Sequence, residues 1–440
     1  MLQSLRQAFT LPDVRKRILF TVAMFAVYVL GAHVPLPGLN RQQMENLFQH
    51  DIFNLLDAFS GGSFRRFAVF ALGVMPYINA SIIFQLLTIA SKTVEDWQKE
   101  GEYGRKKISQ WTRYLTVVLA LVQAAGLVAL LRSMGALEVN TFQWIQIVLG
   151  LTAGTSFLMW MGEQITDKGI GNGISLVIFV GIMVTMPGQI VGTLRLVISG
   201  AATISSFVFL AIIWLAMVVS IIFMQQSHRK VPVQYTRRIV GNRVLGGQSS
   251  FLPLRLNQAG VIPIIFAISL IQLPSAFATG VTAESVAAFV RRLGLTVTGD
   301  GAQNFLDRLN DIFSPGSGFL ASFLYFGLVF FFTYFYTAVT FKPVEVADDL
   351  KKWGGFVPGI RPGRPTAEYL NSVMTRVTLV GAIFLGVIAL APFWIPGLTG
   401  IQTFSLVGGT SLLIVVGVAL DTMQQLEAHL LMRQYEGFVR

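Results

Sequence analysis

The 440-residue chain contains no cysteine and few charged residues. Without cysteine it can form no disulfide bond and no thiolate metal site, and it has no thiol nucleophile. Lys, Arg, Asp and Glu make up only 12% of the residues, about half of their usual share in soluble proteins. So little charge cannot cover the surface of a soluble protein of this length. Soluble enzymes, coiled coils and disordered scaffolds are therefore excluded.

The motifs that mark common catalytic and metal sites are also missing from the sequence. It has no G-x-x-x-x-G-K-[ST] phosphate loop and no H-E-x-x-H zinc motif, and its four histidines lack metal-ligand spacing. Segment 169–173, Gly-Ile-Gly-Asn-Gly, resembles a nucleotide-binding turn only superficially and is better interpreted as the entry to a helix. We expect no bound metal, no cofactor and no enzymatic activity.

Long hydrophobic runs dominate what is present. Hydrophobic residues account for 53% of the chain, and the mean hydropathy is +0.64. Ten uncharged stretches are long enough to cross the roughly 30 Å of hydrocarbon in a bilayer. They cover residues 18–34, 67–90, 114–131, 142–162, 170–194, 205–224, 257–279, 317–341, 377–395 and 404–420. The last two belong to one charge-free run, which Pro392, Pro396-Gly397 and Gly400 are expected to divide. The sequence thus predicts an all-α membrane protein with ten transmembrane helices.

The distribution of charge predicts how these spans are oriented. Of the 33 Lys and Arg residues, 25 fall on the side that holds both termini. Cytoplasmic loops carry an excess of Lys and Arg, so both termini are expected in the cytoplasm. No Asp or Glu lies in the middle of a span, because Glu163 and Asp421 are near cytoplasmic ends. Coupled transporters and intramembrane proteases normally need such groups at the midplane. A secondary transporter with broken helices is therefore the disfavoured alternative.

Residues 52–66 form an amphipathic segment that is too short to cross a bilayer. Gly61-Gly62 supplies a hinge, and Pro76 interrupts the span that follows. A broken segment of this kind is tolerated at membrane depth where it lines a cavity or is buried in protein. An interfacial helix on the outer leaflet explains the pattern equally well.

Two spans near this break carry polar side chains. Asn79, Ser81 and Gln85 lie in the second span, and Ser269 and Gln272 lie in the seventh. Such groups in hydrocarbon mediate helix contacts or line a wetted path, and helix contacts are the commoner role.

Isoleucines recur at helical spacing in two spans. Ile78 and Ile82 are four residues apart, as are Ile178 and Ile182, so each pair shares one face of its helix. Isoleucine in a span usually faces lipid or core, and this spacing alone does not indicate a gate.

Two cytoplasmic loops are longer and more basic than simple connections. Loop 225–256 has six basic and no acidic residues, and its alternating pattern predicts a β-hairpin. Loop 342–376 contains a turn-rich basic tip. Anchoring to anionic headgroups explains basic residues beside a span, but Arg237, Arg238 and Arg361 are far from the span ends. They favour a docking platform for a large partner with phosphate on its surface.

Seven motifs, spread in order over the spans, resemble a single family. They are FALGVMPYINASI at 70–82, GIGNGIS at 169–175, PVQY at 232–235, NQAGVIP at 257–263, GFVPGIRPG at 355–363, GTSLLI at 409–414 and QYEG at 434–437. Taken together, they resemble the bacterial SecY family, the pore subunits of the Sec protein-conducting channel.

The resemblance implies two inverted halves, residues 1–195 and 196–440, around an hourglass pore. Six isoleucines would form its constriction: Ile78, Ile82, Ile178, Ile182, Ile265 and Ile414. A plug within about 52–70 would include Phe59, Ser60, Gly61, Gly62, Phe64, Arg65, Arg66 and Phe67. A lateral gate between the second and seventh spans would include Asn79, Ser81, Gln85, Ser269 and Gln272. Asn79 stands where the family more often has serine.

The resemblance also implies a function and a set of partners. It predicts a passive channel in the bacterial cytoplasmic (inner) membrane that translocates unfolded polypeptides and releases membrane segments laterally. Implied partners are the SecE and SecG subunits, the SecA ATPase, the ribosome with its RNA, signal sequences of preproteins, and membrane lipid, including anionic lipid. The docking residues would be Arg237, Arg238, Arg243, Arg361 and Arg364. A membrane receptor for ribosomes is a third, weaker interpretation.

Overall fold

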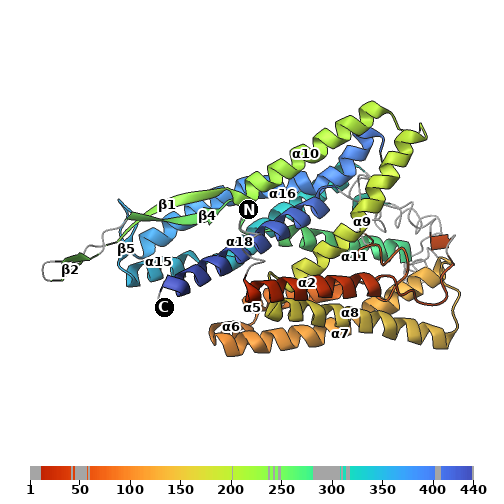
Figure 1. Ribbon diagram of the computed structural model, residues 1–440, viewed down its shortest axis with the longest axis horizontal. Helices are drawn as coiled ribbons and strands as arrows, with labels where there is room; N and C mark the ends of the chain where they lie inside the picture. Colours follow the sequence, from red (N-terminus) through yellow and green to blue (C-terminus); the bar gives the residue numbers. More distant parts are fainter. Residues whose placement is uncertain are drawn as a thin grey trace, which may run out of the picture. The chain divides into compact units, whose positions relative to one another are not determined.

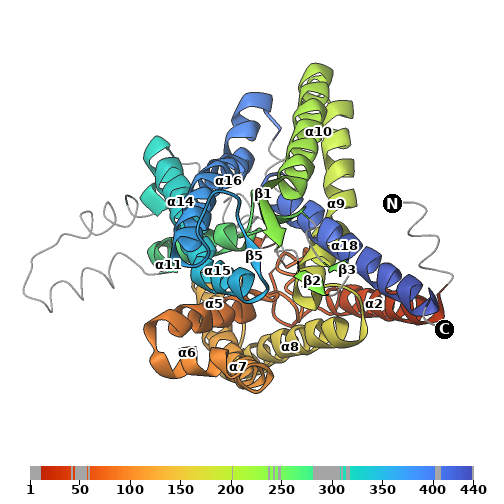
Figure 2. The same ribbon diagram turned by 90° about the vertical axis from the view of Figure 1, so that its left-hand side faces the viewer.

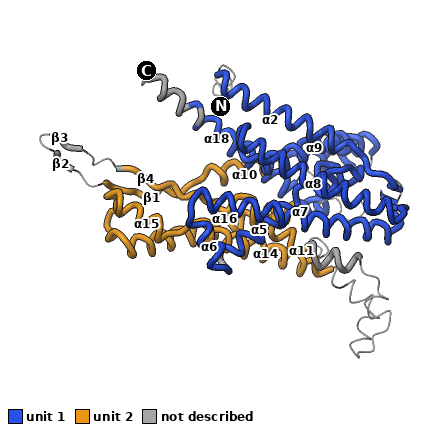
Figure 3. The backbone as a smooth tube through the Cα atoms, turned by 90° about the horizontal axis from the view of Figure 1, so that it is seen from below, with its two compact units in different colours: residues 1–212, 274–310, 392–440 blue, residues 213–273, 311–391 orange. Residues whose placement is uncertain are grey.

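The protein folds into two compact units built almost wholly from helices. The computed structural model describes residues 11–40, 43–44, 57, 60–200, 202–235, 238–240, 243–245, 249–280, 308, 311–313, 318–401 and 408–438 (Figure 1). Unit 1 consists of Met1–Ile212, Pro274–Asn310 and Pro392–Arg440, and unit 2 consists of Ile213–Leu273 and Asp311–Ala391 (Figure 3). This division follows packing and does not test internal symmetry, so the two inverted halves stay a prediction.

A helix occupies each of the ten predicted spans. These helices are α2 (Pro12–Gly31), α5 (Met75–Ala90), α7 (Glu102–Ser133), α8 (Thr141–Lys168), α9 (Gly173–Ile198), α10 (Ile204–Gln226), α11 (Ile262–Gly280), α14 (Phe319–Thr340), α16 (Arg364–Thr399) and α18 (Thr410–Phe438). Two short amphipathic helices, α6 (Lys92–Lys99) and α15 (Pro343–Lys352), lie in connections. Among the described residues, seven helical stretches are long and apolar enough to cross a membrane, namely those of α7, α8, α9, α10, α14, α16 and α18. The fold is that of a multi-pass helical membrane protein.

Prolines begin or continue these helices where the sequence suggested breaks. The interruption expected at Pro76 is the start of α5, because proline is well suited to the first turn of a helix. The division expected at Pro392, Pro396-Gly397 and Gly400 is confirmed at Gly400 but not at the two prolines. Both prolines lie inside α16, which continues to Thr399 and ends before Gly400 with φ of +72°. Membrane helices tolerate internal proline because their neighbours satisfy the freed backbone groups.

The helices of unit 1 pack through small residues. Helix α7 lies along α8 and α5 (Figure 2), and its buried stripe includes Thr116, Ala120 and Ala124. Small side chains on one face let helix backbones approach closely. Helix α8 also packs against α9, and α9 packs against α18. The entry to α9 is capped by Asn172, whose side chain accepts a hydrogen bond from the Ser175 amide, so the interpretation of segment 169–173 as a helix entry is confirmed.

Unit 2 combines helices with a small antiparallel sheet. Strand β1 (His228–Tyr235) pairs along its length with β4 (Ser249–Arg255), and β5 (Gly355–Phe356) adds to its other edge. Strands β2 (Arg238–Val240) and β3 (Arg243–Leu245) form a separate two-stranded ribbon between β1 and β4 in sequence. The hairpin predicted in loop 225–256 is confirmed. That loop and loop 342–376 share one sheet, stabilised by buried Val231, Leu254 and Val357.

Gly154 of α8 marks a close approach between this helix and the irregular chain before α5. A Cβ atom at this position would lie 2.1 Å from the carbonyl oxygen of Val69. We expect Gly154→Ala to lower the free energy of unfolding by about 1–3 kcal/mol, the usual cost of overpacking. Thermal unfolding of the detergent-solubilised protein measures the change.

Gly126 of α7 is the matched control, because a Cβ atom there would meet nothing within 4 Å. Gly126→Ala is expected to be neutral or to stabilise by up to about 1 kcal/mol through helix propensity. Equal unfolding midpoints for the two variants would contradict the close approach at Gly154.

Candidate pore, plug and docking surface

The irregular segment 60–74 connects to α5 and is buried inside unit 1. Ser60, Ser63, Phe64 and Phe67 are all buried, and the backbone runs through successive turns rather than a helix. An interfacial helix would have left one face of this stretch exposed. Of the two interpretations left open by the sequence, residues 60–67 therefore support a broken segment buried in protein. Phe59 and residues 52–56 lie outside the described residues.

Glycines allow this plug segment, residues 60–67, to touch α9. A Cβ atom on Gly61 would lie 2.7 Å from the Cα atom of Gly181, and one on Gly62 would lie 3.2 Å from Thr185 Cγ2. Both plug glycines have positive φ, +67° and +76°, which residues with a Cβ atom rarely adopt. Any larger residue at 61 would therefore separate the segment from the helix.

Hydrogen bonds fasten the plug segment to α2 and to the chain that follows α2. The buried Tyr28 hydroxyl donates to the Ser60 carbonyl over 3.1 Å. The Leu36 amide donates to the Phe67 carbonyl over 2.8 Å, and the Val69 amide donates to the Val34 carbonyl over 3.0 Å. These bonds provide the main-chain partners that an irregular segment needs when it is buried.

Charged groups of the plug segment lie at its margin. Arg65 and Arg66 are exposed, and the Arg65 amide donates to Asp57 Oδ1 over 2.8 Å. Burial raises the pKa of the Asp57 carboxyl above its usual range, and the nearby arginines oppose this shift. The ordered margin of the plug thus includes a carboxylate and two guanidinium groups.

Phe67 is the strained residue of the segment. It is fully buried and has φ of +48°, a conformation that costs a residue with a side chain about 1–2 kcal/mol. Such strain persists only where the surroundings hold it, and it concentrates at functional sites. Sequence reasoning placed Phe67 in the plug but missed this conformation, since no local pattern signals it.

The predicted pore residues lie on α5, α9, α11 and α18. Ile178 and Ile182 are buried on α9, on either side of Gly181 in sequence, and Ile414 is buried on α18, which packs against α9. Ile78 and Ile82 are half-buried on α5. The sixth residue, Ile265, is buried on α11 and belongs to unit 2. Unit 1 thus brings Gly61 of the plug onto the stretch of α9 that carries two of the isoleucines, while the six-residue ring stays a prediction.

The predicted gate residues are distributed over α5 and α11. Asn79, Ser81 and Gln85 are half-buried on α5. The Ser269 hydroxyl of α11 is buried and makes no hydrogen bond within the described part of the chain, which is unusual for a hydroxyl group. The side chain of Gln272 lies outside the described residues. The role of these residues in a gate stays a prediction.

The predicted docking residues that the structure describes belong to unit 2. Arg361 is exposed on the turn between β5 and α16, and its carbonyl accepts a hydrogen bond of 2.9 Å from Thr366. Arg364 begins α16 and forms an exposed 3.5 Å ion pair with Glu368. Arg238 and Arg243 lie in β2 and β3. The side chains of these two residues, and all of Arg237, lie outside the described residues.

An ion pair joins α7 and α8. Arg113 of α7 and Glu163 of α8 approach to 2.6 Å, and Glu163 is the more buried of the two. This pairing explains how a carboxylate is accommodated on an otherwise apolar helix. The sequence placed Glu163 near the end of a span but did not identify its partner.

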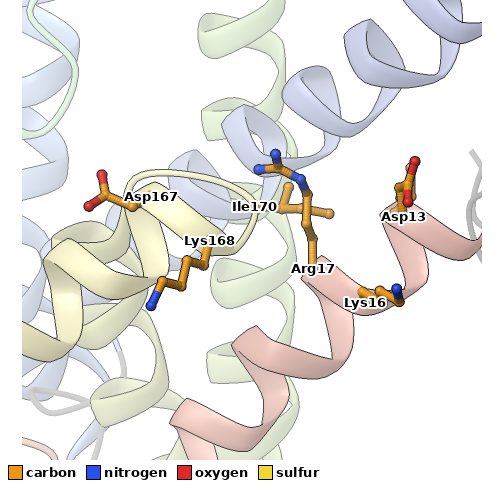
Figure 4. Close-up of a pocket in the computed structure, with 7 residues that line it drawn as sticks. Asp13, Lys16, Arg17, Asp167, Lys168 and Ile170 are labelled. Atoms are coloured by element: carbon orange, nitrogen blue, oxygen red, sulfur yellow. The ribbon is translucent and has the colours of Figure 1, made fainter.

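A pocket of about 470 Å³ lies between the start of α2 and the end of α8. Its charged residues, drawn in Figure 4, are Asp13, Lys16, Arg17, Asp167 and Lys168. Lys16 and Lys168 point away from each other, so these charges do not converge on one ligand position (Figure 4). Arg17 instead donates to the Gly169 carbonyl over 3.2 Å, and Thr21 accepts from the Ile170 amide. These two hydrogen bonds join α2 to the turn between α8 and α9.

Comparison with known sequences identifies one family along nearly the whole chain. The sequence model of the SecY family matches residues 68–423. The protein translocase subunit SecY of Streptomyces galbus is 42% identical over 462 residues, with full coverage of both chains. The protein of the same name from Thermotoga maritima is 42% identical over 453 residues, covering 100% of this chain and 98% of its own length.

Comparison with solved structures identifies the same fold. A structure described as that of a protein conducting channel has a TM-score of 0.61 at 16% identity, covering 94% of this chain and 92% of the other. Sec61 in the canine ribosome-channel complex from the endoplasmic reticulum has a TM-score of 0.58 at 16% identity, with the same coverage. Sequence motifs, family match, full-length identity and fold all agree, and the chain belongs to the SecY family.

Proposed function

We propose that the protein is a passive protein-conducting channel that translocates unfolded polypeptides and releases membrane segments laterally into the bilayer. One observation carries this proposal: Gly61 of the buried irregular segment rests on Gly181 of α9, between Ile178 and Ile182 in sequence. A segment that touches a helix at its aliphatic positions is placed to close a pore that those residues constrict. Relatives named as translocase subunits and a fold shared with protein-conducting channels support the same function.

The constriction would act through its lack of polar groups. A ring of isoleucine side chains dewets and so blocks ions, and it forms no specific bond that would retain a passing polypeptide. We propose that Ile78, Ile82, Ile178, Ile182, Ile265 and Ile414 form this ring.

The plug would seal the pore and leave it again. Its described contacts with α9 are van der Waals contacts at Gly61 and Gly62, and Tyr28 contributes a hydrogen bond from α2. Single contacts of this kind are weak, and Phe67 holds strain that release would relieve. Contacts of this strength with α9 and Tyr28 would allow an entering polypeptide to displace the plug.

Lateral release needs a path from the pore to lipid. We propose that it opens between α5 and α11, where Asn79, Ser81, Gln85, Ser269 and Gln272 would accept signal sequences. Amides and hydroxyls there provide hydrogen bonds for a segment that has not yet reached hydrocarbon. Asn79 is bulkier than serine and would narrow the wetted side of this path.

Energy for translocation would come from partners rather than from this chain. We propose that the sheet β4-β1-β5 and the exposed Arg361 turn dock the SecA ATPase and the ribosome, and that Arg237, Arg238, Arg243 and Arg364 extend the surface. Arginine binds phosphate well, which suits ribosomal RNA as well as anionic lipid. Two solved relatives are described in complexes with ribosomes. SecE and SecG would complete the channel.

The proposed location follows from topology. An excess of basic residues on the side of the termini and relatives from bacteria support a place in the cytoplasmic membrane with both termini in the cytoplasm.

The ring can be tested by substituting one isoleucine on each of α5 and α9. We expect Ile82→Ser and Ile182→Ser to raise the resting ion conductance of the reconstituted channel severalfold, because serine wets the constriction. Both variants should also export preproteins with defective signal sequences. Ile190→Ser, at an exposed position of α9, is the matched control and should leave conductance unchanged. Parental conductance in the first two variants would exclude these residues from the ring.

The plug can be tested at its contact with α9. A Cβ atom on Gly181 would lie 2.8 Å from the Tyr28 hydroxyl and 3.4 Å from Gly61, so Gly181→Val should unseat the plug and raise resting conductance. Gly188→Val on the same helix is the matched control, because a Cβ atom there meets nothing within 4 Å. Single-channel recording measures both. Equal conductance of the two variants would show that the contact between Gly61 and Gly181 does not close the channel.

The docking surface can be tested by reversing one charge. Arg361→Glu should abolish SecA-driven export while the protein still inserts and folds, because an acidic tip repels an acidic or phosphate-bearing partner. Lys352→Glu reverses an exposed charge in the same loop and is the control. Export of a preprotein into inverted membrane vesicles gives the readout. Normal export by the Arg361 variant would remove the docking assignment.

A further inference from the structure

A histidine contacts the plug segment from the end of α2. His33 follows the last turn of this helix, and its Nε2 atom lies 2.6 Å from Nη1 of Arg66. The Nδ1 atom of the same ring lies 2.8 Å from the carbonyl oxygen of Val29. Both ring nitrogens therefore have a partner, and both His33 and Arg66 are exposed to solvent.

These partners determine the protonation state of the ring in this arrangement. A carbonyl oxygen only accepts hydrogen bonds, so Nδ1 must carry the hydrogen that it donates to Val29. A guanidinium group only donates, so Nε2 must be the unprotonated nitrogen that accepts from Arg66. The contact thus requires a neutral imidazole. A second proton would place an N–H group and a positive charge against the Arg66 guanidinium.

The contact between His33 and Arg66 lies at the exposed edge of the plug segment, beside Gly62. The Arg66 side chain extends over Gly62, whose added Cβ atom would lie 3.6 Å from Nη2. The chain after His33 is bonded to the end of the plug through the Val34 carbonyl and the Leu36 amide. Movement of Arg66 therefore acts on the part of the plug that rests on α9.

Other titratable groups lie on the segments beside the contact between His33 and Arg66. Arg65 and Asp57 belong to the plug side, and Tyr28 lies on α2. Glu138 belongs to the connection between α7 and α8, whose backbone is bonded to Gly38. Burial raises the pKa of the Asp57 carboxyl, and the backbone hydrogen bond from Arg65 and the charges of Arg65 and Arg66 oppose this shift.

We propose that His33 is a positioning residue of the plug: while neutral it holds the plug through Arg66, and its protonation from the outer compartment weakens the seal. This inference rests on the proposed channel function. A second proton on the ring would occupy Nε2, the nitrogen that accepts from Arg66. The hydrogen bond is consequently present at higher pH and is replaced by repulsion between two cations as the pH falls. The resting channel leaks more when the outer compartment is acidic.

The experiment measures resting conductance of the reconstituted channel complex with the pH of each compartment changed separately between about 8 and 5. We expect outer acidification to raise the leak about threefold, the order of one exposed charge contact. Acidification of the cytoplasmic side should have no such effect. In His33→Gln the outer response should be lost, since glutamine can accept from Arg66 at every pH in this range. His228→Gln, at an exposed histidine of β1, is the matched control and should respond like the parent.

A second readout follows the plug itself. The chain has no cysteine, so Ser63→Cys introduces a single thiol at a buried plug position. Its labelling by an impermeant maleimide at pH 5 should be faster with His33 than with His33→Gln, and comparison at one pH removes the pH dependence of the thiol.

Failure of the proposed channel function and failure of the proposed role of His33 give different results. Deletion of residues 60–66 should raise conductance at every pH, and if it does not, the plug and the proposed function fail. If deletion opens the channel but the parent shows no outer pH response, only the role of His33 is overturned. A response that persists in His33→Gln comes from another group and equally overturns it.

Discussion

Irregular backbone inside a membrane protein needs a partner for each buried N–H and C=O group, because hydrocarbon provides none. Most of this chain meets the requirement through helices. Segment 60–74 does not, and it depends on bonds such as those of Phe67 with Leu36 and of Ser60 with Tyr28. Glycine at 61 and 181 lets this segment touch α9. The arrangement of α2, α8 and α9 is consequently organised around a short non-helical segment.

The way in which this segment is held matters for its function. Its contacts with α9 are van der Waals contacts at Gly61 and Gly62, but Phe64 and Phe67 belong to a hydrophobic core of unit 1 and would leave it if the segment were displaced. The strained conformation of Phe67 lowers the stability of this arrangement, and the exposed contact between His33 and Arg66 adds only a little to it. Weak attachment to α9 would suit the non-adhesive constriction that we propose.

The side that we propose to be cytoplasmic is organised by other constraints. Its basic residues first suggest topology, and most of them need no further explanation. In unit 2, however, the loops before α11 and after α14 form one sheet, in which β5 pairs with the end of β1 at Gln234 and Tyr235. This pairing gives the exposed Arg361 turn a rigid support. The basic residues thus fall into two groups. Most of them orient the chain in the membrane, and a smaller group lies on a folded surface that we propose docks partners.

The sequence by itself determined the ten helices, because helical hydrogen bonds are local and apolar length decides what crosses a membrane. It also determined which motifs resemble a channel family. Only the tertiary structure decided that Gly61 meets Gly181, that Phe67 adopts positive φ, and that α16 continues past Pro396. These features depend on contacts between residues far apart in the chain, and such contacts leave no periodic pattern in the local sequence.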